Sequence, residues 1–532
     1  MNASADPHTA PGNSRKTSLF KHLASVVLGI MTSRIFGLAR DIISASFWGA
    51  SGVAQAAFNT AWAVPNSLRH LFGEGAFTAA FVPMLSSRLT GEDRTEAWKL
   101  AEKAISVQAI VLFACTFLVS LFSVGMYCLE PWQFAPHIKQ LYLILPILMP
   151  YALLICMAGS FASIMNSLNH FSLPSHTPVI FNIVQIATIG YIALFWKNTE
   201  TTALLIFSAS TILAGLLQLL VLMLAARRLG FCFHFHPDWK DHDVLLLCRR
   251  ILPGLVGSGV MQINSLADKI IGAYLGQEAV GALTYSMHLM NLPVSLFGTA
   301  LATVSLPALS RAWSQKDTET ILDTLNSSFR FTLFLTLPTA AALVILRFPL
   351  VQIFFQRGAF TMDATAKVAT ALAFYMTGLP AYCGVKIAAA AFHSRQDTHT
   401  PVVVSSICMI LNIVLNIILM QFLKQNGLAL STSFCSWLNV SLLLWLNRKY
   451  LANWRPTSLL PEASRLLLAT AVMGAVLLGC LRLSVNAQGF LPTLLRLAFS
   501  GASGGLAFLA TGFLLRSQAL REILRTLRRR TK

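Results

Sequence analysis

Fourteen apolar segments follow one another along this 532-residue chain, and each is long enough to cross the roughly 30 Å hydrocarbon core of a bilayer as a helix. Hydrophobic residues make up 55% of the chain and charged residues 11%, whereas soluble domains have about 25% charged residues. We therefore predict an all-α polytopic membrane protein with fourteen transmembrane helices. The segments lie at about 22–50, 55–87, 104–128, 138–166, 174–196, 201–226, 244–275, 281–310, 328–356, 367–393, 400–423, 427–447, 463–483 and 491–515.

The distribution of basic residues predicts the orientation. If the N-terminus is cytoplasmic, 27 of the 40 Lys and Arg residues fall in cytoplasmic segments, eight in outer segments and five inside helices. By the positive-inside rule, both termini are expected in the cytoplasm. Residues 1–20 are then a polar cytoplasmic tail rather than a signal peptide, since no small-residue cleavage site follows. The basic tail at 517–532 is expected to lie against anionic headgroups rather than to bind nucleic acid.

The chain also repeats itself at three places in the same order. The offsets are 228, 225 and 223 residues, which is hard to attribute to chance. Both copies hold six helices, so we predict two parallel six-helix lobes at 21–227 and 228–450 around a central cavity, with two extra C-terminal helices at 451–516. The matches are LARDII (38–43) with LADKII (266–271), LFGEGAFTAAFVPMLSSR (71–88) with LFGTALATVSLPALSRA (296–312), and HTPV (176–179) with HTPV (399–402).

The first two helices carry charges that hydrocarbon tolerates poorly. Each ionised side chain at mid-bilayer costs about 2.5 to 3.5 kcal/mol on insertion scales, so this cost indicates a polar interior rather than a lipid-facing surface. Residues seven apart return to nearly the same helix face, which places Arg34 above Asp41. The polar residues concerned are Arg34, Arg40 and Asp41 in the first helix, and Asn66, Arg69 and Glu74 in the second.

These charges allow two interpretations. They could form internal salt bridges that join two helices. However, three arginines face only two carboxylates, and the planar guanidinium of arginine matches phosphate oxygens in pairs. The surplus of arginine favours a buried site for an anionic ligand.

The second half carries fewer buried polar residues. They are Gln262, Asn264, Asp268 and Lys269 on the seventh helix, His288 on the eighth and Lys386 on the tenth. A lone histidine such as His288 is more often a packing residue than a ligand, because a neutral imidazole is tolerated in cores. Lys386 lies nine residues from the basic boundary at Arg395, or about 13.5 Å along a helix, which strains the reach of a snorkelling side chain. We expect Asp268 and Lys269 to pair charges or act in gating.

No cofactor or metal site is indicated. The nine cysteines are scattered without a CxxC pair or a histidine cluster at ligand spacing. The phosphate-binding pattern GxxxxGK[ST] is absent, and the few carboxylates have arginine neighbours, which does not suggest an enzyme.

Several motifs resemble the lipid II flippases of the MurJ (MviN) type, which belong to the multidrug/oligosaccharidyl-lipid/polysaccharide exporter superfamily. The resemblance extends from the first helix to the twelfth. It implies two lobes around a cationic cavity, with the two C-terminal helices lining a lipid groove. The motifs are SRIFGLARD (33–41), PNSLRHLFGEGAFTAAFVP (65–83), LPVSLFGTALATVSLPALS (292–310), FFQRGAFT (354–361) and FHSRQDTHTPV (392–402).

The resemblance also implies the substrate and the residues that bind it. The family's substrate is an undecaprenyl-diphosphate-linked disaccharide-pentapeptide, and its functional arginines fall on Arg34, Arg40 and Arg69. Asp41, Asn66 and Glu74 stand beside them in the same motifs. Two positions depart from the family pattern, because His288 replaces an arginine and Ala56 replaces an acidic residue. The wall near His288 is then less cationic, and a carboxylate for gating or ion coupling is missing at Ala56.

The leading hypothesis is therefore a flippase that moves lipid II to the outer leaflet of the bacterial inner membrane by alternating access. Membrane lipids and cell-wall synthesis or division proteins would be its other partners. The alternatives are an exporter of drugs or of another lipid-linked oligosaccharide, and a non-transporting cell-wall scaffold. A cation exporter should have surplus carboxylates in its first lobe, whereas this lobe has surplus arginine. A scaffold does not explain buried charge.

Overall fold

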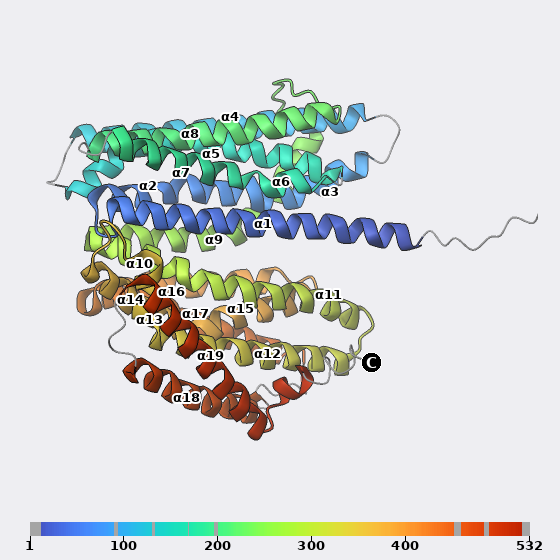
Figure 1. The fold of residues 1–532 in the computed structure, drawn as a ribbon. Helices are drawn as coiled ribbons and strands as arrows, with labels where there is room; N and C mark the ends of the chain where they lie inside the picture. Colours follow the sequence, from blue (N-terminus) through green and yellow to red (C-terminus); the bar gives the residue numbers. More distant parts are fainter. Residues whose placement is uncertain are drawn as a thin grey trace, which may run out of the picture. The chain divides into compact units, whose positions relative to one another are not determined.

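The computed structural model describes residues 12–89, 94–129, 134–168, 170–195, 200–451, 459–483 and 489–523, and within these ranges the chain is helical with no β-strand (Figure 1). The first half contains α1 (Gly12–Trp48), α2 (Val53–Leu68), η1 (Arg69–Gly75), α3 (Ala76–Arg88), α4 (Thr95–Leu129), α5 (Pro136–Ser167), α6 (Ser172–His176), α7 (Pro178–Phe195) and α8 (Glu200–Arg228). The second half contains α9 (His242–Leu275), α10 (Gln277–Pro293), η2 (Val294–Thr299), α11 (Ala300–Ser314), α12 (Thr318–Ile345), α13 (Arg347–Phe355), α14 (Met362–Met376), α15 (Leu379–His393), α16 (His399–Leu423), α17 (Gln425–Asn447), α18 (Leu460–Leu483) and α19 (Phe490–Leu514).

The prediction of an all-α multi-pass membrane protein is confirmed. Among the described residues, eleven helices are long and apolar enough to cross a membrane, and the pair α14 and α15, bent by 44°, makes a twelfth span. The other two predicted spans correspond to α1 and to the continuous run from α2 through η1 to α3. These are the segments that carry the charged motifs. If both cross, the total is the predicted fourteen.

The chain divides into two compact units. Unit 1 comprises residues 1–44 and 61–259, and unit 2 comprises residues 45–60 and 260–532. The chain passes from one unit to the other inside α1, inside α2 and inside α9. The predicted lobe boundary at 227/228 stays a prediction.

Unit 1 is built around α5. This helix packs against α4 and α8, and α7 packs against α8, so these helices run side by side (Figure 1). Its apolar core includes Phe81, Leu85, Ile105 and Phe161, each of which is almost completely buried. Burial of this many large side chains fixes the helices that carry the first-half motifs.

Unit 2 also contains the connection between α1 and α2. The amide of Ala359 donates to the carbonyl oxygen of Ser46 at 2.8 Å. A Cβ atom on Gly281 of α10 would lie 1.9 Å from the carbonyl oxygen of Ala50, so only glycine allows the two backbones to approach this closely. α18 and α19 pack against each other and α18 packs against α12, through a cluster that includes Leu466, Ala469 and Phe508.

Two segments adopt π-helical geometry at equivalent places in the repeat. η1 begins at Arg69 and η2 begins at Val294. Each contains a glycine that packs tightly on a cysteine backbone: a Cβ on Gly73 would lie 3.4 Å from Cα of Cys156, and one on Gly298 would lie 3.1 Å from Cα of Cys383. Because π-turns are rare overall but enriched at functional sites, this pair marks one candidate functional segment in each repeat.

The segment between α8 and α9 is held on the end of α4. The ammonium group of Lys103 donates to Asp238 at 3.0 Å and to Asp241 at 2.6 Å. The hydrogen bond from Lys103 lowers the pKa of both carboxyl groups below the usual value for aspartate. The carboxylates therefore stay ionised at neutral pH, and this segment is fixed as part of unit 1.

Candidate functional site

The arginine motif of α1 lies in unit 1. Nε and Nη2 of Arg40 donate to the same oxygen of Asp41, at 3.1 and 2.7 Å. Arg34 is exposed and makes no ion pair in the described part of the chain. Asp41 therefore pairs with its neighbour Arg40 and not with Arg34, which helix periodicity had placed above it. The guanidinium group of Arg34 stays available for an anion from outside the chain.

Helix α7 supports this motif from behind. Nδ2 of Asn182 donates to the carbonyl oxygen of Ser33 at 3.2 Å, one residue before Arg34. The guanidinium carbon of Arg40 stands 5.4 Å from the centre of the Phe181 ring. That ring in turn stacks on Trp62 of α2, with ring centres 5.1 Å apart. Polar and cation–π contacts thus orient the arginine face of α1.

Arg69 is the first residue of η1, and its side chain is half-buried. Pro65 precedes it in α2 and cannot donate a backbone hydrogen bond, which loosens the helix there. At the other end, Gly75 has φ −96° and ψ −101°, outside the helical region, and a Cβ there would lie 2.8 Å from the carbonyl oxygen of His70. Glu74 lies within η1, but its side chain falls outside the described part of the structure. Asn66, half-buried, precedes η1 on α2.

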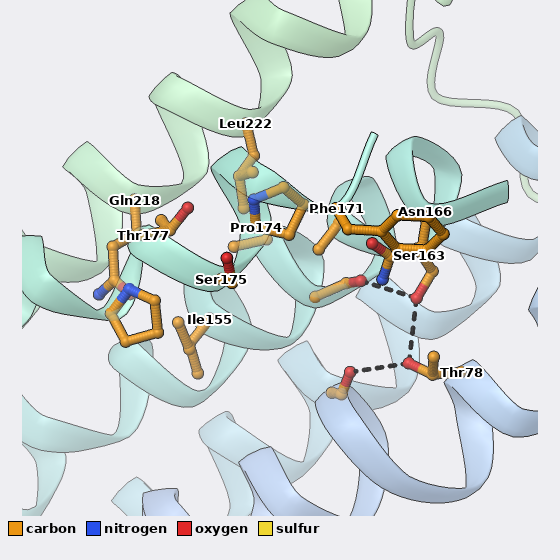
Figure 2. Close-up of a pocket in the computed structure, with 15 residues that line it drawn as sticks. Thr78, Ile155, Ser163, Asn166, Phe171, Pro174, Ser175, Thr177, Gln218 and Leu222 are labelled. Atoms are coloured by element: carbon orange, nitrogen blue, oxygen red, sulfur yellow. Dashed lines mark hydrogen bonds between the residues drawn. The ribbon is translucent and has the colours of Figure 1, made fainter. Parts of the chain in front are cut away.

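A pocket of about 360 Å³ lies beside η1 within unit 1 (Figure 2). Its polar wall is a chain of hydroxyl groups: Thr78 Oγ1 is 3.0 Å from Ser163 Oγ, and Ser163 donates to the carbonyl oxygen of Gly159 at 2.9 Å. Asn166 and Gln218 add amide groups. None of the described residues that line this pocket is charged, and the predicted arginines are not among them. The pocket leaves an open space on the side of η1 where Gly73 lies.

In the second half, Asp268 accepts a hydrogen bond from Nδ2 of Asn416 at 2.6 Å. Asn416 also donates to Asn412 at 3.1 Å, and Ser431 donates to Asn416. Lys269 lies beside Asp268 on a small void, and the two form no ion pair among the described residues. Buried carboxylate and amide groups are thus satisfied within unit 2 by α9, α16 and α17.

Lys386 and His288 contact different neighbours within unit 2. Nζ of Lys386 donates to Oγ1 of Thr299 at 2.8 Å, next to Gly298 in η2. Lys386 also lines a pocket of about 380 Å³ with Asn264, Asn412 and Asn439. His288 is half-buried on α10, and its ring meets the edge of Tyr285 at 6.2 Å between ring centres.

The structure thus brings together Arg40 with Asp41, and it places Asn66, Arg69 and Glu74 on one continuous segment. The supporting residues Phe181 and Asn182 were not predicted from the sequence. Neither were Asn412 and Asn416, although two asparagines four residues apart in an otherwise apolar helix are a signal of a buried polar site.

The chain is similar to known proteins over most of its length. The family model described as lipid II flippase MurJ matches residues 44–499. A probable lipid II flippase MurJ of Rhizobium meliloti (strain 1021) is 33% identical over 471 residues, covering 86% of each chain. A protein of the same description from Vibrio cholerae serotype O1 is 32% identical over 432 residues, covering 79% of this chain and 81% of its own.

Solved structures show the same fold. A lipid II flippase MurJ in an inward closed conformation superimposes with a TM-score of 0.77, at 24% identity, over 92% of this chain and 98% of its own. An inward-facing multidrug resistance transporter of the MATE family superimposes with a TM-score of 0.65, at 10% identity, over 81% of this chain and 98% of its own.

Proposed function

The chain belongs to the lipid II flippase MurJ family, and from this premise we propose that it moves lipid II across the inner membrane by alternating access. The observation that carries the proposal is the surplus of arginine in unit 1. Arg34, Arg40 and Arg69 lie on segments that otherwise read as membrane spans, and Asp41 already pairs with Arg40. A diphosphate fits guanidinium groups of this kind, because its oxygens accept their N–H groups in pairs.

The chemistry of the substrate suggests a role for each polar residue of the site. The diphosphate of the undecaprenyl-linked precursor binds the guanidinium groups, and Asn66 donates hydrogen bonds to the headgroup. Translocation makes and breaks no covalent bond in the substrate, so the protein acts as a transporter and not as an enzyme. Asp41 and Glu74 pair charges with the arginines when the substrate is absent.

We propose the same orientation that the basic residues predict, with both termini in the cytoplasm of the bacterial cell. In this orientation the substrate enters from the cytoplasmic leaflet, where it is made, and leaves toward the outer leaflet. Proteins of cell-wall synthesis or division would then receive it.

Complementation tests the function directly. The full chain, expressed in cells depleted of their own lipid II flippase, should restore growth. In vesicles, the purified protein should move lipid II to the opposite leaflet. If neither growth nor movement is restored while the protein is inserted at normal levels, the proposal is wrong.

His288 allows a second test of the substrate site. We propose that it meets the headgroup at the position where the family pattern has arginine. His288→Arg should then bind lipid II several-fold more tightly, because a fixed charge is added, and His288→Ala should bind it more weakly. Binding titrations on the purified proteins measure both changes, with thermal unfolding as the control for folding. Unchanged affinity in both variants, with lower thermal stability in His288→Arg, would show that the imidazole only packs against Tyr285.

A further inference from the structure

A cavity of about 550 Å³ opens where α19 ends and the chain turns back. Its lining joins two kinds of side chain: Phe513, Leu514 and Leu520 are apolar, and Arg516 and Arg521 are cationic. Among the described residues, no carboxylate lines it. The cavity lies within unit 2, so its walls come from one compact body.

The apolar side of the cavity continues the lipid-facing surface of a membrane helix. Phe513 and Leu514 are the last two residues of α19, and their side chains are 66% and 78% exposed. Leu520, also part of the lining, is buried and belongs to the cluster that holds α18 and α19 together. An acyl chain running along α19 would cover the two exposed side chains.

The cationic side has no anionic partner within the described part of the chain. Arg516 and Arg521 are exposed and form no ion pair there. The nearby carboxylates are used elsewhere, because Glu522 pairs with Arg330 at 3.2 Å and Glu462 is buried under the turn. Two positive charges therefore face the cavity without compensation.

The turn that carries these arginines is rigidly anchored. Glu462 of α18 accepts hydrogen bonds from the hydroxyl group of Ser517, from the amide of Gln518 at 3.0 Å and from the amide of Ala519 at 3.1 Å. On the opposite face, Arg330 of α12 donates to the side chain of Gln518 at 2.8 Å. The backbone that carries the two arginines is thus set before any ligand arrives, so that only their side chains must be ordered on binding.

Arg516 occupies a backbone conformation that favours glycine. Its φ is +56°, in the left-handed region, at the end of α19. Lys316 has nearly the same conformation, φ +55°, at the end of α11, and it lines none of the cavities described above. A cation at the end of a helix interacts favourably with the helix dipole in both cases, so Lys316 serves as an internal control for that effect.

We propose that this cavity binds the phosphate headgroup of an anionic phospholipid from the surrounding membrane. Arg516 and Arg521 hold the phosphate oxygens, and one acyl chain lies along Phe513 and Leu514. The site is separate from the lipid II site proposed on unit 1. It does not depend on the flippase function.

Lipid binding to the purified full chain in a neutral detergent tests the site. Short-chain phosphatidylglycerol, short-chain phosphatidylcholine and inorganic phosphate are titrated separately, and bound lipid is counted by native mass spectrometry. Phosphatidylglycerol should bind more tightly than phosphatidylcholine, and phosphate alone should bind weakly. Arg516→Gly and Arg521→Gln should each weaken phosphatidylglycerol binding about fivefold, as expected for one cation at a headgroup.

Lys316→Gly is the matched control, which distinguishes an effect on lipid binding from an effect on folding. Arg516→Gly and Lys316→Gly both relieve a left-handed residue, so neither should lower the temperature of unfolding. Only Arg516→Gly should weaken binding of phosphatidylglycerol. Equal affinity for the two lipids, unchanged affinity in Arg516→Gly, or an equal loss in Lys316→Gly would each overturn the proposal. Phosphate binding as tight as that of the lipid would show a site for free anions instead.

Discussion

Replacement of Arg34, Arg40 or Arg69 by alanine should abolish complementation while leaving membrane insertion intact. Each substitution removes a charge-assisted hydrogen bond to the diphosphate, which is worth about 1.5 to 3 kcal/mol, or roughly 10- to 150-fold in affinity. Arg40→Ala also leaves Asp41 without the ion pair that the structure shows. Growth of depleted cells and the amount of protein in the membrane are the two measurements.

Lysine and a distant arginine provide the controls. Arg40→Lys keeps the charge but cannot offer two parallel N–H groups, so it should rescue growth poorly. Arg249→Ala removes an exposed arginine near the start of α9 and should complement normally. If Arg34→Ala, Arg40→Ala and Arg69→Ala all support growth at normal protein levels, these arginines do not form the diphosphate site.

Gly281→Ala should be the most damaging methyl addition among the glycines whose surroundings the structure describes. The new Cβ would lie 1.9 Å from the carbonyl oxygen of Ala50 and 2.7 Å from its carbonyl carbon. A backbone carbonyl cannot rotate away as a side chain can, so α10 must separate from the α1–α2 connection at a cost of about 3 kcal/mol or more. We expect a large fall in the temperature of unfolding in detergent and a loss of monodisperse protein.

Gly479→Ala is the matched control for this variant. Gly479 lies inside α18, and a Cβ there would meet nothing within 4 Å. Alanine should therefore stabilise this helix slightly, by about 0.5 to 1 kcal/mol. If Gly281→Ala unfolds at the same temperature as the wild type, residues 45–60 do not pack on unit 2 as the structure shows.

Much of the fold could be predicted from hydrophobic length alone. Each of the fourteen predicted segments corresponds to one helix or to a short series of helices, because a span must be apolar and long whatever it packs against. The breaks inside the segments could not be predicted. α14 and α15 separate around Gly378, where a Cβ would lie 2.8 Å from the hydroxyl oxygen of Ser433, and that contact depends on α17.

The residues of the candidate site could be predicted from the sequence, but the pairs that their side chains form could not. The arginine surplus is visible in the sequence because charges stand out among apolar residues. The choice of Arg40 rather than Arg34 as the partner of Asp41 depends on side-chain conformation, and the cation–π contact with Phe181 depends on where α7 packs. The π-helical geometry of η1 and η2 was also invisible, since a single wide turn leaves no periodic signal.

The position of these two wide turns bears on the ancestry of the chain. η1 and η2 begin 225 residues apart, the same offset at which LFG at 71–73 recurs at 296–298. The π-helical geometry could have arisen twice at equivalent positions. It is simpler if it arose once, in an ancestor of half the length that was then duplicated. At the same offset, Glu74 corresponds to Thr299, so the two copies have diverged in charge while both retained the turn. The π-helical geometry then predates the difference in charge between the two halves. It has been retained in both copies, whereas the side chains on it have changed.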